Sequence, residues 1–297
     1  MPDDSSRQQA VTLLEEWLQQ RLDADQYQWL LESIEKTLNS NSGKDLYITL
    51  GMIPRRLPRV DLALDDTELQ RAQAARPGWD PSLWSVDGAA RSLVLARLAL
   101  HRPQQIGDTF CELCRTADVG ESITLFSTLP LLPADERIDQ QVGDGLRSNM
   151  RSVFEAIAHR NPYPKETFDQ NRWNHMVLKA LFVDSTLGPI QGLDERANAE
   201  LARILCDYAH ERWAADRAIT PELWRCVGPF ASGDMLDDLE RALQSDNAST
   251  REGAALALTA SNDKRAEDLL AGQPQIRAAI AQGELTWASL TGTSPTA

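Results

Sequence analysis

The sequence has no long apolar run and few cysteines. No stretch approaches the roughly 20 consecutive apolar residues that a membrane-spanning helix needs. The N-terminus, Met1-Pro2-Asp3-Asp4, lacks the basic start and the apolar segment of a secretory signal. The four cysteines are too few and too scattered for a disulfide framework. These absences predict a cytoplasmic protein without direct membrane insertion.

Basic residues are in the minority. Lys and Arg total 30 against 44 Asp and Glu, which gives a net charge of −14. Because an acidic protein repels phosphate backbones and anionic lipids, we expect no nucleic-acid partner. The hydrophobic share of 42% is nevertheless large enough for a folded chain with a sizeable core.

The motifs of common catalytic, metal and nucleotide sites are missing. The four histidines are far apart, and no Gly-x-Ser-x-Gly, Gly-x-Gly-x-x-Gly or phosphate-binding loop occurs. Cys111 and Cys114 have C-x-x-C spacing, but a zinc site needs further clustered ligands and a thioredoxin-like site follows a strand. They lie in a helical pattern instead, which favours simple packing. We therefore predict no catalytic residue, no metal and no cofactor, and an enzymatic activity stays an open alternative.

Helical periodicity is what the sequence does contain, along most of its length. Val11, Leu14 and Leu18 recur at three- and four-residue steps, the spacing of one helix face. No run alternates with the period of two that strands require. The pattern predicts an all-α protein. The short polar connections favour an irregular α-solenoid, a HEAT- or armadillo-like stack of antiparallel helices.

The breaks in this pattern predict the organisation of the chain. Asp23 or Asp25 is expected to cap the second helix. Single helices are expected over 136–159 and 194–214. The chain divides into four parts, which we expect to form one continuous domain overall: a helical hairpin (1–43), an irregular Pro-containing connection (44–85), a helical-repeat-like domain (86–290) and a disordered tail (291–297).

The most unusual stretch lies between His159 and Asp184. Its first half contains Pro162-Tyr163-Pro164, which we expect to form a stiff loop because each proline fixes φ. Its second half is a helix that is apolar almost all round yet carries polar side chains, and an unpaired buried polar group costs roughly 1–3 kcal/mol. Six residues are therefore candidates for a ligand- or partner-binding site: Asn161, Tyr163, Trp173, Asn174, His175 and Lys179.

Two interpretations of these side chains stay open. In the structural one, Asn174 bonds the stiff loop, and Lys179 reaches solvent or pairs with a carboxylate. In the functional one, Tyr163, Asn174, His175 and Lys179 line a pocket for a small anionic or aromatic molecule.

The same stretch resembles the signature of the EboA family. The similarity rests on Asn161-Pro162-Tyr163-Pro164 and on the run from Trp173 to Phe182. EboA proteins are encoded in a bacterial gene cluster for secondary-metabolite traffic. The resemblance implies partners from that cluster: a UbiA-like prenyltransferase, a TatD-like hydrolase, a sugar-isomerase-like barrel protein and a dehydroquinate-synthase-like protein. It implies no catalytic residue.

Two hypotheses of function follow. The first is a non-catalytic helical scaffold or adaptor in secondary-metabolite trafficking or biosynthesis, because stacked helices present extended binding surfaces. The alternative is a small-molecule-binding protein or an enzyme that acts on an aromatic or prenylated intermediate. In that case Lys179 with a depressed pKa, or His175 as a base, is the reactive group.

Overall fold

The computed structural model describes residues 3–40 and 43–291. Within these ranges the chain is helical and contains no strand, which confirms the predicted all-α class. One isolated antiparallel bridge joins Asp61 and Ser85. Of the tail predicted at 291–297, Thr291 ends the last helix, and the rest lies outside the described residues. None of the helices in the described part is long and apolar enough to cross a membrane.

The contacts divide the chain into two compact units, residues 1–167 and residues 168–297. The boundary after Thr167 falls inside the segment 86–290 that the sequence predicts as one helical-repeat-like domain. The division into 1–43, 44–85 and 86–290 stays a prediction, as does the solenoid arrangement.

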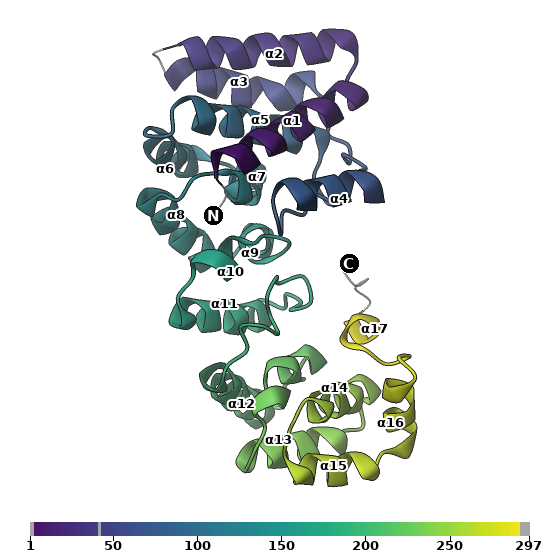
Figure 1. The fold of residues 1–297 in the computed structure, drawn as a ribbon. Coiled ribbons are helices and arrows are strands. Elements are labelled where there is room, and N and C mark those ends of the chain that lie inside the picture. The colour runs from purple at the N-terminus through teal and green to yellow at the C-terminus, as the bar shows by residue number, and fades with distance from the viewer. Residues whose placement is uncertain (1–2, 41–42, 292–297) are drawn as a thin grey trace. The chain divides into compact units, whose positions relative to one another are not determined.

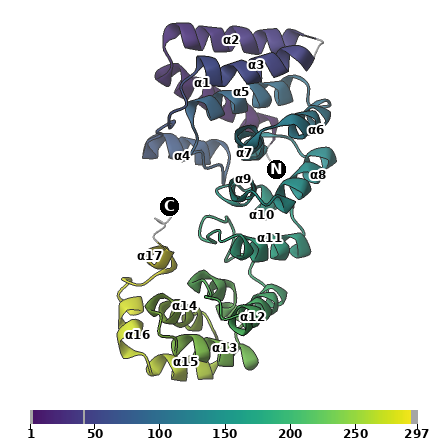
Figure 2. The same cartoon turned by 180° about the vertical axis from the view of Figure 1, so that it is seen from behind.

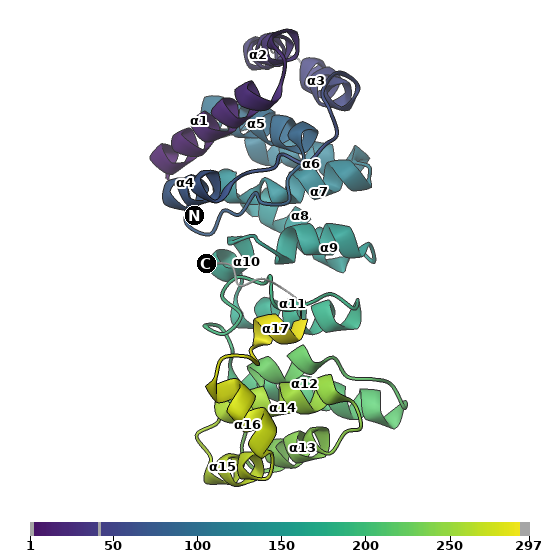
Figure 3. The ribbon, with the colours of Figure 1, turned by 90° about the vertical axis from the view of Figure 1, so that its right-hand side faces the viewer.

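Unit 1 is built from helices that pack around one long buried helix, α5. Eleven of the sixteen residues of α5 (Val86–His101) are buried, and α1, α2, α3 and α7 all pack against it. Helices α2 and α3 lie side by side at one end of the unit (Figures 1 and 3). The helices of unit 1 are α1 (Asp4–Arg21), α2 (Ala24–Asn39), α3 (Gly43–Arg56), α4 (Asp66–Ala75), α5 (Val86–His101), α6 (Ile106–Thr116), α7 (Val119–Ser127), the 3-10 turn η1 (Leu129–Leu131), α8 (Glu136–Arg147), α9 (Arg151–Ala158) and α10 (Tyr163–Thr167).

Local capping signals explain where several of these helices begin. Asp23 caps α2. Its carboxylate accepts a hydrogen bond from the backbone N–H of Gln26, and the side-chain oxygen of Gln26 accepts one from the backbone N–H of Asp23. This reciprocal capping box satisfies two amides that a helix start otherwise leaves open. Of the two caps that the sequence predicts, Asp23 is therefore the correct one. Asp65 and Asp118 cap α4 and α7 in the same way.

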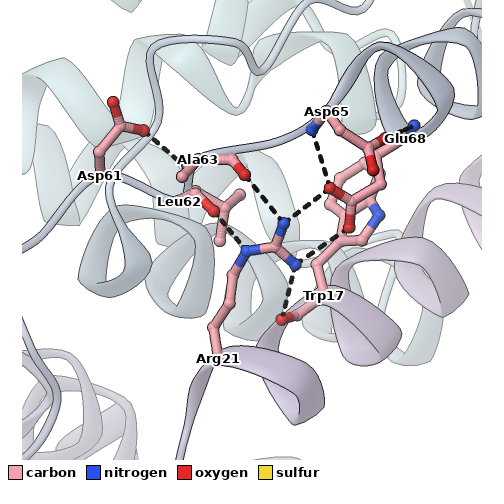
Figure 4. A network of polar contacts seen from close by, with 7 residues as sticks. All are labelled: Trp17, Arg21, Asp61, Leu62, Ala63, Asp65 and Glu68. Carbon is pink, nitrogen blue, oxygen red and sulfur yellow. Dashed lines mark hydrogen bonds and ion pairs between the residues drawn. The ribbon is translucent and has the colours of Figure 1, made fainter.

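A single arginine fastens the connection between α3 and α4 to α1. The Arg21 guanidinium donates to the carbonyl oxygens of Leu62 and Ala63 and forms a two-pronged ion pair with Glu68, with the shorter bond at 2.7 Å (Figure 4). Glu68 also accepts from the Asp65 amide, so it completes the capping box of α4. The irregular stretch before α4 is thereby held by charge-assisted bonds, which are the stronger class of hydrogen bond.

Unit 2 is organised around α14. Small residues let α14 and its neighbours approach closely. A Cβ added at Gly253 of α14 would lie 2.6 Å from the Pro221 Cβ of η2. A Cβ added at Gly228 of η3 would lie 2.3 Å from the carbonyl oxygen of Ala257 in α14. Helix α14 accordingly packs against both 3-10 turns and against α13, α15, α16 and α17 (Figure 2). The helices of unit 2 are α11 (Gln170–Phe182), α12 (Ala199–Ala214), η2 (Pro221–Cys226), η3 (Gly228–Phe230), α13 (Asp234–Leu243), α14 (Ala248–Thr259), α15 (Lys264–Ala271), α16 (Pro274–Ala281) and α17 (Trp287–Thr291).

Two helix predictions are wrong in their extent. The expected single helix over 136–159 is two helices, α8 and α9, because the Ser148 hydroxyl accepts from the Met150 amide and turns the chain there. The helix expected over 194–214 begins only at Ala199, since Asn198 is its N-cap. In both places a short polar side chain bonds the backbone locally and competes with the helix.

Candidate functional site

The boundary between the units divides the six candidate residues. Asn161 and Tyr163 belong to unit 1, whereas Trp173, Asn174, His175 and Lys179 belong to α11 in unit 2.

Asn161 is a buried anchor whose amide group is fully used. The chain enters it through Arg160 with a positive φ of 50°. Its Oδ1 accepts from the Tyr163 amide at 3.0 Å, and its Nδ2 donates to the carbonyl oxygens of Phe126 and Ala156, both at 3.1 Å. An Asn that bonds the amide two residues ahead makes an Asx turn. Asn161 thus ties this turn to α7 and α9.

Tyr163 is buried at the start of α10. The prediction of a stiff loop here is wrong in part, because Tyr163–Thr167 is a short helix. Pro164 lies in its first turn, where a missing backbone N–H is tolerated. The Tyr163 hydroxyl donates to the Asp139 carboxylate at 3.0 Å. Its aromatic ring is 3% exposed, so this side chain connects α10 to α8 from within the core.

An ion pair secures the other side of α10. The Arg76 guanidinium donates to both carboxylate oxygens of Glu166 at 2.8 Å, and it also donates to the carbonyl oxygens of Pro77 and Pro130, each at 3.0 Å. Burial by itself raises the pKa of Glu166, but charged hydrogen-bond donors, Arg76 among them, outweigh it and hold the pKa below its usual value. The residues beside Tyr163 therefore serve the architecture of unit 1.

In unit 2, Trp173 is completely buried and packs under a cation. The Arg196 guanidinium carbon lies 4.5 Å from the centre of the indole ring, and its Nη2 donates to the Phe168 carbonyl oxygen at 2.8 Å. Burial lowers the pKa of Arg196. A guanidinium over an indole face is an attractive cation–π contact. Trp173 and Arg196 together fix the start of α11 against the loop before α12.

Asn174 pairs with another asparagine. The Asn198 Nδ2 donates to the Asn174 Oδ1 at 2.9 Å, and the Asn174 Nδ2 donates to the Asn198 Oδ1 at 3.3 Å. The same Asn198 Oδ1 accepts from the Leu201 amide and caps α12. The structural interpretation predicts that the Asn174 side chain is hydrogen-bonded within the protein, which is correct. It names the stiff loop as the partner, which is wrong, because Asn174 bonds Asn198, the N-cap of α12.

His175 and Lys179 lie on the other side of α11. His175 is exposed, and Lys179 is half-buried, with a pKa that burial lowers. Phe182 follows on the same face and is 74% exposed, which is unusual for a large apolar side chain. Because Asn174 lies on the buried face, these neighbours in sequence have different surroundings. Helix α11 therefore presents a mixed polar and apolar strip to solvent.

Unit 1 contains a groove that sequence reasoning missed, although Asn161 lies in its lining. It has a volume of about 250 Å³ and is bordered by Trp79, Trp84, His159 and Arg160. Arg160 faces the Asp80 carboxylate at 3.5 Å. The loop that supplies Trp79 and Trp84 is distant from Asn161 in sequence, and no local signal indicates that they meet.

A buried carboxylate in unit 2 also went unnoticed in the sequence. Glu222 is 3% exposed, and its oxygens accept from the amides of Leu187 and Gly188 at 3.0 and 2.8 Å. It holds the long connection between α11 and α12. Each oxygen of the Glu222 carboxylate thus accepts one backbone N–H, so the side chain stabilises the fold.

The thiols have environments that suppress reactivity. Cys111 and Cys114 lie inside α6, and burial raises the pKa of Cys114 to about 12. Burial also raises the pKa values of Cys206 and Cys226 to about 12. Because the thiolate is the reactive form, these groups are poor nucleophiles and poor metal ligands near neutral pH. Among the described residues, no His, Cys, Asp and Glu cluster has the make-up of a metal site.

Comparison with known proteins gives one match. The family model described as "Metabolite traffic protein EboA" matches residues 10–228, well over half of the chain. This range contains all six candidate residues and ends before α13. No curated protein and no solved structure matches the chain.

Proposed function

Since the chain belongs to the EboA family of metabolite traffic proteins, we propose that it is a non-catalytic helical adaptor in that traffic. In this proposal it acts in the cytoplasm and binds a protein of the same gene cluster: the UbiA-like prenyltransferase, the TatD-like hydrolase, the sugar-isomerase-like barrel protein or the dehydroquinate-synthase-like protein. The contact is made by α11.

The observation that carries the proposal is the division of α11 into two faces. Trp173 and Asn174 are buried and hold the helix in place, whereas His175 and Phe182 are exposed. An exposed Phe beside polar groups is the composition of a protein-binding surface, where aromatic side chains supply most of the binding energy. Of the six predicted residues, we therefore propose His175 and Lys179 for the partner-binding surface, and we add Phe182, which the sequence analysis did not include.

The environments of the reactive groups favour an adaptor over an enzyme. The hydroxyl of Tyr163 and the amides of Asn161 and Asn174 are already engaged in bonds that stabilise the fold. Three of the thiols have pKa values near 12. The enzymatic alternative rests on Lys179. Burial lowers its pKa, and an amine nucleophile requires a lowered pKa.

Affinity purification of the tagged protein from its own host tests this proposal. We expect near-stoichiometric recovery of one of the four named partner proteins, and its loss with Phe182→Ser. Val60→Ser is the matched control, since Val60 is another exposed apolar side chain, at 57% against 74%, and lies outside both α11 and the groove of unit 1. If both variants retain the partner, or if none of the four proteins is recovered, the proposal fails.

A second candidate function is supported by the groove of unit 1. Trp84 and Trp79 form an edge-on aromatic pair with ring centres 5.9 Å apart, and Arg160 and His159 supply polar groups beside them. Such a lining suits an aromatic metabolite, which stacks on indole and hydrogen-bonds at its rim. Small-molecule mass spectrometry on the same purified protein tests it. A bound aromatic compound that is lost with Trp84→Ala, but kept with Phe182→Ser, favours the carrier over the adaptor.

A further inference from the structure

A different pocket in unit 1 lies between α3, α5, α6 and α7, and it has one charged group in an apolar setting. Its floor consists of Leu50, Leu95, Leu113 and Leu125, one from each helix. Arg91 of α5 enters the same pocket. The enclosed part of the pocket, about 50 Å³, admits one compact chemical group such as a carboxylate, and the pocket is open to solvent, so the rest of a ligand extends outward over the apolar lining. None of the six candidate residues lies in its lining.

Arg91 is buried without the partners that such a residue needs. It is 9% exposed, and its Nε is completely buried with no hydrogen-bond partner. Within the part of the chain that the structure describes, the closest carboxylate is that of Glu121, at 3.8 Å from Nη2, which is beyond hydrogen-bonding distance. A guanidinium carries five N–H donors, and a buried charge without bonds to satisfy it is costly.

Two other arginines of the same unit, the buried Arg76 and the half-buried Arg21, show what a satisfied guanidinium looks like. Arg76 bonds two carbonyl oxygens and Arg21 bonds three, and each also bonds both oxygens of one carboxylate (Figure 4 for Arg21). Their donors are used within the protein. The Nε atoms of Arg7 and Arg97 also lack a partner, but both guanidinium groups donate to a carboxylate through another nitrogen, and neither residue lines this pocket. Within the described residues, the donors of Arg91 are left for a group that is not part of the fold, because a buried polar group without a partner requires such a reason.

The rest of the lining determines what that group is. The hydroxyls of Thr116 and Thr124 donate to carbonyl oxygens of their own helices, so Arg91 is the main source of free donors. No lysine lies in the lining, and Glu121 adds a negative charge. One guanidinium matches one carboxylate in the two-pronged geometry that arginine favours, whereas a phosphate dianion calls for more positive charge.

We propose that this pocket binds a small apolar monocarboxylate, with the carboxylate on Arg91 and the hydrocarbon part on the four leucines. The ligand carboxylate supplies the acceptors that the fold omits. Its ring or chain covers the leucine side chains, which removes apolar surface from water. The proposal is independent of the α11 surface, so either one can fail without the other.

Ligand titration followed by NMR, with phenylacetate as the probe, tests the pocket. Phenylacetamide has nearly the same shape without the charge, and phenyl phosphate has a second negative charge. We expect phenylacetate to bind at least tenfold more tightly than either compound. Equal binding of phenylacetate and phenylacetamide, or tighter binding of phenyl phosphate, overturns the proposal.

Variants locate the binding. Arg91→Met should weaken phenylacetate binding at least tenfold, while Arg147→Met, which removes an exposed arginine of α8, should leave it unchanged. Glu121→Gln should strengthen binding severalfold, because it removes the charge that opposes the carboxylate. Gln also preserves the capping box of α7, so this variant keeps the test valid even if Arg91→Met does not fold. Unchanged affinity in a folded Arg91→Met overturns the proposal, and so does unchanged affinity in Glu121→Gln if Arg91→Met does not fold.

Discussion

Arg76 and Arg91 are both almost fully buried in unit 1, but only Arg76 has its donors satisfied. Arg76 joins the end of α4 to η1 and α10 through four hydrogen bonds. Arg91 has a carboxylate at 3.8 Å and a buried Nε without a partner. Burial alone therefore does not distinguish a structural role of an ionised side chain from a binding role. The contacts around it decide whether it stabilises the fold or is kept for something else.

The largest effect is expected at Arg76. Arg76→Met should lower the free energy of unfolding by on the order of 3 kcal/mol, because it removes the two-pronged bond from the Glu166 carboxylate and the guanidinium donors from two carbonyl oxygens. Urea denaturation of the wild type and the variant measures this. Arg147→Met, at an exposed position, provides the baseline and should change stability by less than about 0.5 kcal/mol. An equally small change in Arg76→Met would show that the ion pair has no structural weight.

Asn174 of unit 2, like Arg76, is a buried polar side chain with a hydrogen-bond partner, here Asn198. Asn174→Ala should cost about 1–2 kcal/mol of stability, because it removes both bonds to the half-buried Asn198 side chain and leaves a gap at a buried position. His175→Ala, the neighbouring exposed position, should have almost no effect on the same denaturation curve. If the two variants are equally stable, Asn174 is not the structural anchor described here and becomes a stronger candidate for binding.

The pH dependence of the Arg76–Glu166 pair gives a smaller but more specific signal. The pKa of Glu166 is lower in the folded protein than its ordinary value, so the pair stabilises the fold above that ordinary value, about 4.3 in an unfolded chain. This contribution is lost as the pH falls through the folded pKa. The stability difference between the wild type and Glu166→Gln should therefore be constant near neutral pH and shrink below about pH 4. A difference that stays constant down to pH 3 would contradict this.

The helical class and many helix positions could be predicted from the sequence because they depend on local signals. Apolar residues at three- and four-residue steps mark α1 and α5, and Asp23 with Gln26 marks the start of α2. The same signals are ambiguous where a short polar side chain competes for backbone bonds. Ser148 and Asn198 end or delay helices that periodicity alone would continue.

The site was harder to predict, because its contacts join segments that are distant in sequence. The buried polar side chain of Asn174 could be anticipated from its place in an apolar helix, but its partner Asn198 could not. The groove beside Asn161 depends on Trp79 and Trp84, and the pocket at Arg91 depends on four helices. In the sequence, Arg91 is one arginine among many. In the described part of the structure, its guanidinium lines a pocket without a hydrogen bond, whereas Arg7 and Arg97, whose Nε atoms also lack a partner, donate to carboxylates.

The unfolding free energy of Arg91→Met, measured by urea denaturation without added ligand, tests the contrast between the two arginines most directly. Replacing an unsatisfied buried charge by an apolar side chain should leave stability unchanged or raise it by about 1 kcal/mol. A loss comparable to that of Arg76→Met would contradict the account, because it would mean that Arg91 stabilises the fold as Arg76 does.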